Sequence, residues 1–338
     1  MRRDALPEFS GSHARHTCRW PCSNPIDEYN RDNELNRPKV SIGLPVFNGA
    51  DFICQAIQSI LLQDYGDFEL IISDNASTDE TEAICRVFAD KDTRIRYERN
   101  EVNIGAAGNY NKVFHAARGE YFKWAAHDDE CHPTMLSRCA SFLETAPDTV
   151  TMVYPRGELI DEQGRTILAG LDRIECTDPR PHRRLAYLLW SLNYCDPVFG
   201  LFKAEYLRRT QLIGPFFGAD YVLLGELAML GEIRELNETL FRLRAHSRRS
   251  MKANPGARAR AAWYDPSAAR KMFILPEWER MIWEMLKAVR CSPLSTAEKA
   301  RCFLAAPGMH YWRRFRSAGG RMKNRIREYA GGLGAVQE

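Results

Sequence analysis

Two adjacent carboxylates, Asp128 and Asp129, directly follow an apolar and aromatic run at residues 122–126. Such a run is typical of a buried strand, and open α/β sheets bind their ligands just beyond the carboxyl ends of the strands. Neighbouring carboxylates repel each other and suit a hard divalent cation such as Mg²⁺ or Mn²⁺. An acidic turn with a helix cap before Pro133 would explain the same pair without a ligand. The segments upstream favour the ligand site.

The chain before this pair alternates between strand and helix patterns. Apolar residues recur with helical spacing over 52–61, and Ser77 with Glu80 has the spacing of a capping box that opens a second helix. Pro45 is expected to end the first strand because it cannot donate to a sheet ladder. The alternation predicts right-handed crossovers and a mostly parallel sheet with helices on both faces. Strands are expected at 39–44, 68–72, 94–97 and 121–126, and a third helix at 109–117.

The loops that leave these strands should lie together, because the carboxyl ends of parallel strands meet at one edge of the sheet. Acidic and amide side chains converging on an Asp pair are not explained as solubilising surface. No G-x-G-x-x-G follows the first strand and no G-x-x-x-x-G-K is present, which argues against a dehydrogenase or a P-loop protein. The converging loops are 45–48, 74–77, 103–108 and 127–130.

Four segments, in this order, closely resemble the amino-terminal half of family 2 inverting glycosyltransferases with the GT-A fold. They are Val40–Asn48, Ser73–Asp79, Asn103–Gly105 and His127–Asp129. The resemblance is strong over 38–145 and weaker to about residue 250. It implies an α/β, Rossmann-like GT-A domain that transfers a sugar from a nucleoside-diphosphate sugar, with UDP the expected nucleotide. The acceptor would be a hydroxyl of a glycan or lipid-linked molecule, as in the synthesis of cell-surface polysaccharide or glycolipid.

The resemblance also implies roles for residues of the donor site. Pro45 and Phe47 would line the nucleoside pocket, and Asp74 would hydrogen-bond the base. Asp128 would approach the ribose or the sugar, and Asp129 would ligate the Mg²⁺ or Mn²⁺ on the diphosphate. The donor-binding loops would further include Asn48, Asn75, Gly105 and Asn109. His127 takes the first position of the family's Asp-x-Asp motif; this leaves fewer carboxylates for the cation, although magnesium needs only one or two.

The second half of the chain should supply a general base within reach of the acceptor hydroxyl. Asp220 precedes an apolar helical pattern, and its Gly-x-Asp context resembles the place where the family keeps its catalytic base. A favourable position at a helix N-terminus explains Asp220 equally well. Glu226 is the second candidate, because on a helix it lies six residues on and away from the Asp220 face.

Basic residues alternate along 240–246 as they would on one face of a strand. Arg242, Arg244 and His246 suit phosphate, and a histidine can complete a metal shell, so His246 is a predicted metal ligand beside the donor diphosphate. In the resembling family a similar Arg-x-His segment lies near the donor phosphates. A solvated basic edge strand is the alternative explanation.

Composition divides the 338 residues into three regions. Residues 1–37 read as a flexible extension, and 38–250 as the GT-A domain, with a nucleotide-sugar half at 38–153 and an acceptor and base half at 154–250. Residues 251–338 read as a helical, basic C-terminal extension. No run approaches the roughly 20 apolar residues of a membrane span, and the N-terminus lacks an apolar signal region, so a cytoplasmic location is expected.

The basic, aromatic stretch 311–327 predicts a peripheral contact with an anionic membrane surface. A solvated helix or a partner-docking helix explains the same pattern. Nucleic acid is not an expected partner, because the net charge is only +3 and no recognised binding motif accompanies it.

Two other functional classes remain for comparison. A nucleotidyltransferase would need a Gly-rich loop with a basic residue after the first strand, which residues 45–48 do not offer. A non-catalytic sugar-nucleotide-binding or scaffold protein on the same fold is compatible with His127. It predicts donor binding without turnover.

Overall fold

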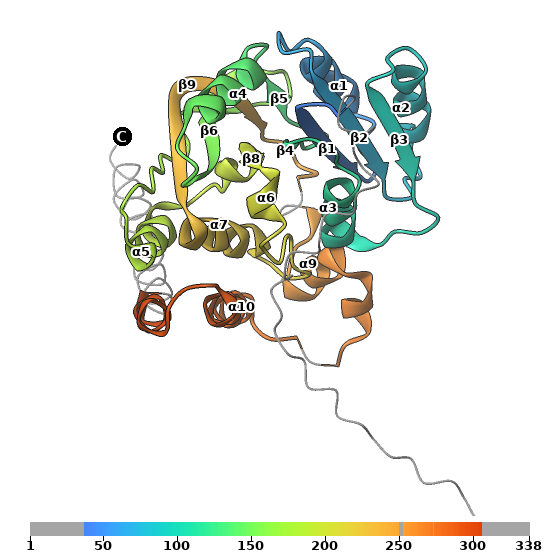
Figure 1. Ribbon diagram of the computed structural model, residues 1–338. Coiled ribbons are helices and arrows are strands. Elements are labelled where there is room, and N and C mark those ends of the chain that lie inside the picture. The colour runs from blue at the N-terminus through green and yellow to red at the C-terminus, as the bar shows by residue number, and fades with distance from the viewer. Residues whose placement is uncertain (1–36, 250–252, 273, 306–338) are drawn as a thin grey trace, which may run out of the picture.

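The computed structural model describes residues 37–249, 253–272 and 274–305. Within them the strands form one sheet in the order β3-β2-β1-β4-β8-β6-β9-β5, with β7 paired to β6 (Figure 1). The strands are β1 Val40–Val46, β2 Phe68–Asp74, β3 Ile95–Arg99, β4 Tyr121–Trp124, β5 Glu130–Cys131, β6 Val150–Ile160, β7 Thr166–Ala169, β8 Leu201–Lys203 and β9 Glu232–Arg244. The helices are α1 Ile53–Leu61, α2 Thr81–Ala89, α3 Gly105–His115, α4 Met135–Thr145, α5 Pro181–Ser191, α6 Ala204–Leu207, α7 Ala219–Leu230, α9 Ala257–Tyr264 and α10 Glu277–Cys291, with 3-10 turns at Asp196–Phe199 and Pro266–Arg270.

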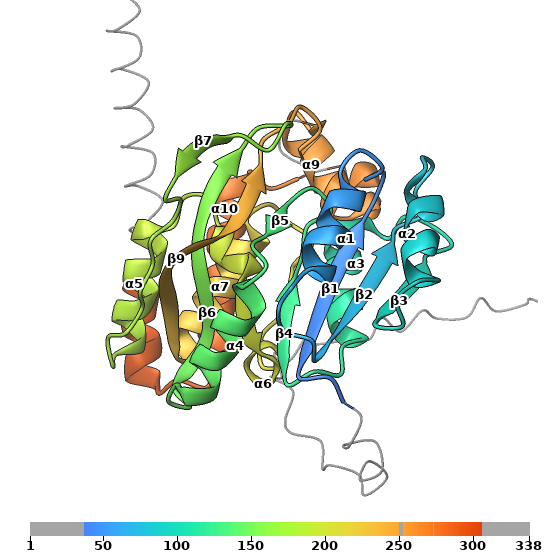
Figure 2. The same ribbon diagram turned by 90° about the horizontal axis from the view of Figure 1, so that it is seen from above.

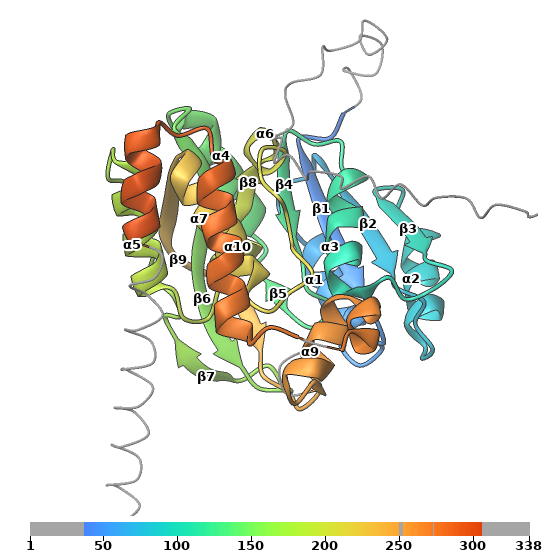
Figure 3. The same ribbon diagram turned by 90° about the horizontal axis from the view of Figure 1, so that it is seen from below.

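The sheet separates two hydrophobic cores. Alternate residues of β2 serve both, since Leu70 and Ile72 pack with α1 and α4 while Ile71 packs on the opposite side. Figure 2 shows α1 and α4 over one face, and Figure 3 shows α3, α7 and α10 over the other. The first four strands in the order β3-β2-β1-β4 are all parallel, and antiparallel pairs enter with β8. The α/β architecture with helices on both faces is the predicted one.

Two local predictions in the first half are wrong. β1 continues through Pro45 to Val46, because its pairing with β4 has already ended at Gly43 and no ladder bond is lost on that side. The capping box does not form: α2 begins at Thr81 without a side-chain cap. The Ser77 hydroxyl instead accepts a hydrogen bond from the backbone N–H of Asn48, 2.9 Å away.

The second half differs more from expectation. β9 lies inside the sheet, between β6 and β5, so it is not a solvated edge strand. The apolar segment 197–202 is divided between a 3-10 turn and the short β8. The polar segment 160–181 contributes β7 and a bridge between Cys176 and Ile233.

The helices after residue 256 pack on the face of the sheet that α3 and α7 cover. α9 packs against α3, and α10 packs against α7 through the buried side chains of Met281 and Met285. No helix among the described residues has both the length and the apolar character to cross a membrane. The basic stretch 311–327 lies outside the described residues.

Candidate active site

Four loops meet at the carboxyl edge of the parallel strands. The Asn48 side-chain oxygen accepts a hydrogen bond from the Thr78 N–H at 2.8 Å. Asn75 donates to the Asn103 side chain at 2.9 Å and accepts from the Ile104 N–H at 2.9 Å. The 127–130 loop packs closely against the first of these loops. A Cβ atom added to Gly49, the neighbour of Asn48, would lie only 2.6 Å from the His127 ring. The convergence predicted from the strand order is therefore present.

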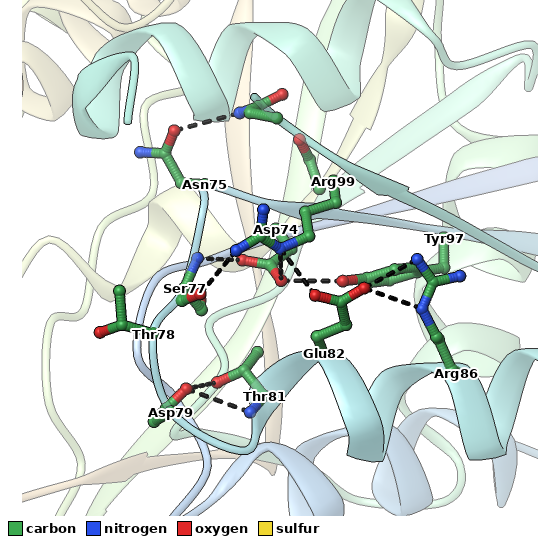
Figure 4. Close-up of polar contacts among 12 residues, drawn as sticks. Asp74, Asn75, Ser77, Thr78, Asp79, Thr81, Glu82, Arg86, Tyr97 and Arg99 are labelled. Carbon is green, nitrogen blue, oxygen red and sulfur yellow. Dashed lines mark hydrogen bonds and ion pairs between the residues drawn. The ribbon is translucent and has the colours of Figure 1, made fainter. Parts of the chain in front are cut away.

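Asp74 lies at the centre of the second of these loops (Figure 4). Its carboxyl is fully buried; one oxygen accepts the Ser77 N–H and the other accepts the Tyr97 hydroxyl, each at 2.8 Å. Arg99 lies 3.7 Å from it. A carboxylate has about four lone-pair sites, and two are already used. A nucleotide base would therefore bind Asp74 only as an additional hydrogen-bond donor. The base-binding role of Asp74 stays a prediction, and in this structure the residue holds the turn.

The other predicted donor residues divide into exposed and structural groups. Phe47 is 39% exposed, and Asn48 beside it is exposed too. Asn109 is buried and exchanges hydrogen bonds with Ser73, so its amide is satisfied within the fold. Pro45 is a buried residue of β1, Asn75 ties two loops together, and Gly105 starts α3 with a φ of +81°.

The acidic pair has two very different members. The buried Asp129 accepts the backbone N–H of Arg244 at 2.8 Å, and burial followed by the charge of Asp128 raises its pKa well above the usual range. Asp128 accepts a hydrogen bond from His246 at 2.8 Å. Burial opposes its ionised form, but the charges of His127, His246 and Arg249 outweigh this and lower its pKa. His246 thus contacts Asp128, and its predicted role as a metal ligand stays a prediction.

The predicted basic clamp is used internally. The Arg244 side chain is 3% exposed and donates to the backbone oxygens of Asp128, Asp161 and Glu162, with an ion pair to Glu130. Arg242 pairs with Glu130 and with Glu158. These guanidinium groups fix the acidic loop.

Cation binding would depend on the ligand as well as on the chain. Among the described residues no group of three or more His, Cys, Asp or Glu side chains is arranged to hold a metal ion. Asp128 and Asp129 offer hard oxygen donors, and a dication would offset the repulsion between them. The site therefore fits a cation that brings further oxygen ligands with it.

Asp220 is close to the same tyrosine as the acidic pair, Tyr110. It lies in the first turn of α7, and its charge acts on the Tyr110 hydroxyl of α3 together with the charges of Asp128 and Asp129. Burial is the largest cause of the raised pKa of Tyr110, and these three carboxylates follow. Glu226 lies instead in the core, where it accepts hydrogen bonds from Gln211, and burial raises its pKa to about 7.

Residues 41–210 match the sequence model of glycosyl transferase family 2. The chain belongs to this family. The predicted family and the glycosyltransferase nature of the domain are thereby confirmed. The match ends before Asp220, His246 and α9, so family membership does not test their roles.

Curated relatives of this family 2 domain share parts of its length. An uncharacterised glycosyltransferase of Rickettsia felis is 36% identical over 141 residues, which are 40% of this chain and 23% of the relative. WcaA of Escherichia coli, named for colanic acid biosynthesis, is 39% identical over 102 residues, 30% of this chain and 37% of WcaA. An uncharacterised glycosyltransferase of Nostoc is 28% identical over 215 residues, 62% of this chain and 65% of the relative. The chain thus spans about a quarter of the Rickettsia protein.

Solved structures confirm the GT-A fold of the family 2 domain. S. aureus TarS, residues 1–349, in complex with UDP-GlcNAc has a TM-score of 0.59 and 15% identity, covering 81% of this chain and 72% of that one. A second structure of TarS residues 1–349 has a TM-score of 0.58 and 16% identity to this chain, with the same coverage of both chains.

Three residues near the site were not singled out from the sequence. Tyr110 lies among the three carboxylates, Arg249 acts on both Asp128 and Asp129, and Tyr264 of α9 lies close to Asp220. Arg249 follows His246 by three residues, so the basic run 244–249 was the available signal. The two tyrosines had none, because only the packing of α3 and α9 brings them to the site.

Proposed function

We propose that the protein transfers a sugar from a nucleoside-diphosphate sugar to an acceptor hydroxyl with inversion. The proposal rests on family membership and on one observation: Asp128 and Asp129 from one half of the sheet and Asp220 from the other all act on Tyr110. A single displacement requires a general base for the acceptor hydroxyl, and a carboxylate on the side away from the donor's acidic pair can supply it.

In this mechanism Asp220 is the general base. The acceptor oxygen forms a bond to the anomeric carbon while the bond from that carbon to the phosphate oxygen breaks, and the acceptor proton passes to the Asp220 carboxylate. The nucleoside diphosphate leaves on the side of Asp128 and Asp129. Asp220 lies at the N-terminus of α7, where the helix dipole favours its charged form.

A divalent cation, Mg²⁺ or Mn²⁺, is part of the proposal. Asp129 would hold it, with Asp128 adjacent and the diphosphate supplying further oxygens, and the ion would neutralise the charge that develops on the leaving group. His246 would act mainly by fixing Asp128 through their hydrogen bond. Arg249, whose charge already acts on both carboxylates, would add to the cationic field around the diphosphate.

Donor, acceptor and location are the finer parts of the proposal. UDP is the first nucleotide to test, because TarS has the same fold and its structures are in complex with UDP and with UDP-GlcNAc. A glycan or lipid-linked acceptor in polysaccharide synthesis is proposed because WcaA is named for colanic acid biosynthesis. Action in the cytoplasm, with the basic stretch 311–327 on a membrane surface, would suit such an acceptor.

A thermal-shift screen tests the donor site. UDP, dTDP and GDP are added with and without Mn²⁺ to the wild type, to Asp129→Ala and to the surface control Asp178→Ala. A ligand that binds only the folded state raises the melting temperature by mass action. We expect metal-dependent stabilisation by one nucleotide in the wild type and the control, and its loss in Asp129→Ala. If no nucleotide stabilises the wild type, the proposal is contradicted and a scaffold role on the same fold gains support.

A further inference from the structure

Two buried acids lie behind Asp220, and the proposed mechanism does not use them. Asp172 and Asp196 are each 2% exposed. The Asp172 carboxyl accepts the backbone N–H groups of Asn193, Tyr194 and Cys195 at 2.7–3.0 Å. These three donors make the Asp172 carboxyl an acceptor that is held in place by the 193–195 backbone.

Asp196 has the opposite character. One of its oxygens accepts the Asp172 N–H at 3.2 Å, while Oδ2 is buried without a hydrogen-bond partner among the described residues. Burial, followed by the charge of Asp172, raises the pKa of Asp196 to about 8. A carboxyl that keeps its proton has an O–H to donate, and the Asp172 carboxyl is the acceptor beside it. The absence of a side chain at Gly157 leaves space for the Asp196 carboxyl, because a Cβ atom there would lie 2.9 Å from Oδ2.

The other titratable groups around the pair do not compete for this proton. Tyr154 of β6 and Cys195 face the pair, and burial raises the pKa of both so far that neither titrates between pH 6 and 9. Glu235 of β9 also acts on Tyr154, but it is paired with Arg156 at 2.8 Å and lies 3.6 Å from Arg173. Asp220 of α7 lies on the far side of Cys195, whose thiol is close both to Asp220 and to the pair.

The turn that Asp172 holds is also in contact with the candidate base. The Cys195 thiol lies against the Asp220 carboxyl, and the Tyr221 hydroxyl donates to the Asn193 carbonyl at 2.9 Å. Cys195 has a φ of +63°, a left-handed conformation that costs free energy in a non-glycine residue. The turn therefore depends on the hydrogen bonds to Asp172.

We propose that Asp172 and Asp196 share one proton, and that this acid pair is a positioning device that holds the 193–196 turn against Asp220. The second clause rests on the proposed function, because it treats Asp220 as the base, whereas the shared proton rests on the burial of both acids and on the unpartnered Oδ2 of Asp196. Loss of the proton would leave two buried carboxylates in repulsion, loosen the turn and displace Asp220.

Infrared difference spectroscopy between pH 6 and 9.5 tests the shared proton. The proteins are the wild type, Asp196→Asn and Glu226→Gln, the last removing another buried carboxyl whose raised pKa lies near 7. We expect a protonated-carboxyl band that disappears near pH 8 in the wild type and in Glu226→Gln and is absent from Asp196→Asn. The band of Glu226 disappears near pH 7 in the wild type and in Asp196→Asn and is absent from Glu226→Gln. A band from Asp129 is common to all three proteins and cancels when the difference spectrum of a variant is subtracted from that of the wild type. Loss of a band near pH 8 in Asp196→Asn overturns the proposal.

The pH profile of UDP-N-acetylglucosamine hydrolysis tests the positioning role in the same proteins. Above pH 8 we expect kcat to fall about tenfold per pH unit in the wild type and in Glu226→Gln with KM unchanged, and to stay level in Asp196→Asn, whose amide cannot ionise. The same alkaline fall in Asp196→Asn overturns the positioning role. Absence of hydrolysis in all three contradicts UDP-N-acetylglucosamine as the donor, and the infrared difference then still supports the shared proton.

A second variant covers the case in which Asp196→Asn does not fold. Gly157→Ala places a methyl group 2.9 Å from Asp196 Oδ2 and so disturbs the pair without removing a carboxyl. We expect the pH at which its protonated-carboxyl band disappears to differ from that of the wild type. An unshifted band would show that Oδ2 does not carry the shared proton.

Discussion

In the half of the sheet built from β1 to β4, loop residues are held by hydrogen bonds among neighbouring loops; in the half built from β6 to β9, they are held by buried charges. Ser77 and Asn48 exemplify the first case, with a single bond at a partly exposed loop. Arg244 exemplifies the second, because it contacts four residues in two segments, 128–130 and 161–162, from 82 to 116 residues away. The difference predicts many small stability costs in the donor half and few large ones in the other.

The largest effect should come from Asp220→Asn. Removal of a general base typically lowers kcat by about 10²–10⁴-fold, while donor binding on the opposite side should persist. Steady-state donor turnover and the nucleotide-induced shift in melting temperature measure the two separately. Transfer at the wild-type rate would show that Asp220 is not the base.

Arg244→Met should destabilise the fold by about 3–5 kcal/mol, because it leaves Glu130 and three backbone carbonyls without their buried partner. Urea denaturation gives this value. Arg242→Met is the matched control from the same strand: its side chain is 32% exposed, against 3% for Arg244, so it should cost less. Equal costs for the two variants would remove the distinction between buried and exposed charge in this half.

Gly105→Ala should cost about 1–3 kcal/mol, since Gly105 has a φ of +81° and an added Cβ would lie 2.4 Å from the Tyr264 carbonyl oxygen. Gly66→Ala is the control, because a Cβ there would meet nothing within 4 Å. Thermal unfolding of both compares them directly. A Gly105→Ala protein as stable as the control would mean that α9 does not dock on α3 in solution.

Ser77→Ala should give the smallest effect, about 0.5–1.5 kcal/mol, because one hydrogen bond at a partly exposed loop is lost. The midpoint of urea unfolding measures it. A cost as large as that of Arg244→Met would show that the donor loops are a cooperative network and not a sum of small contacts.

The donor half was predictable because its signals are local. Each strand, turn and helix start lies within about ten residues, so loops 45–48, 74–77 and 127–130 could be assigned to one sheet edge before the structure was known. The two errors there each concern a single hydrogen bond. Pro45 does not end β1 because no ladder bond is lost at its position, and the Ser77 hydroxyl binds the Asn48 loop instead of capping α2.

The base half was less predictable because its site depends on distant contacts. The sequence identified Asp220 and His246 as candidates, but not that His246 would pair with Asp128, 118 residues away. Arg244 looked like a phosphate ligand by residue type, and only its burial shows that it is a structural ion. The Asp172 and Asp196 pair has no sequence signal, since each alone resembles an ordinary turn residue.

Tyr264 touches the starts of both helices that carry the candidate site. Its carbonyl lies against Gly105, where α3 begins, and its hydroxyl bonds to the backbone of Gly218, directly before α7. A hinge motion that separated the two halves would strain both contacts at once. We therefore expect the two halves to keep a fixed spacing.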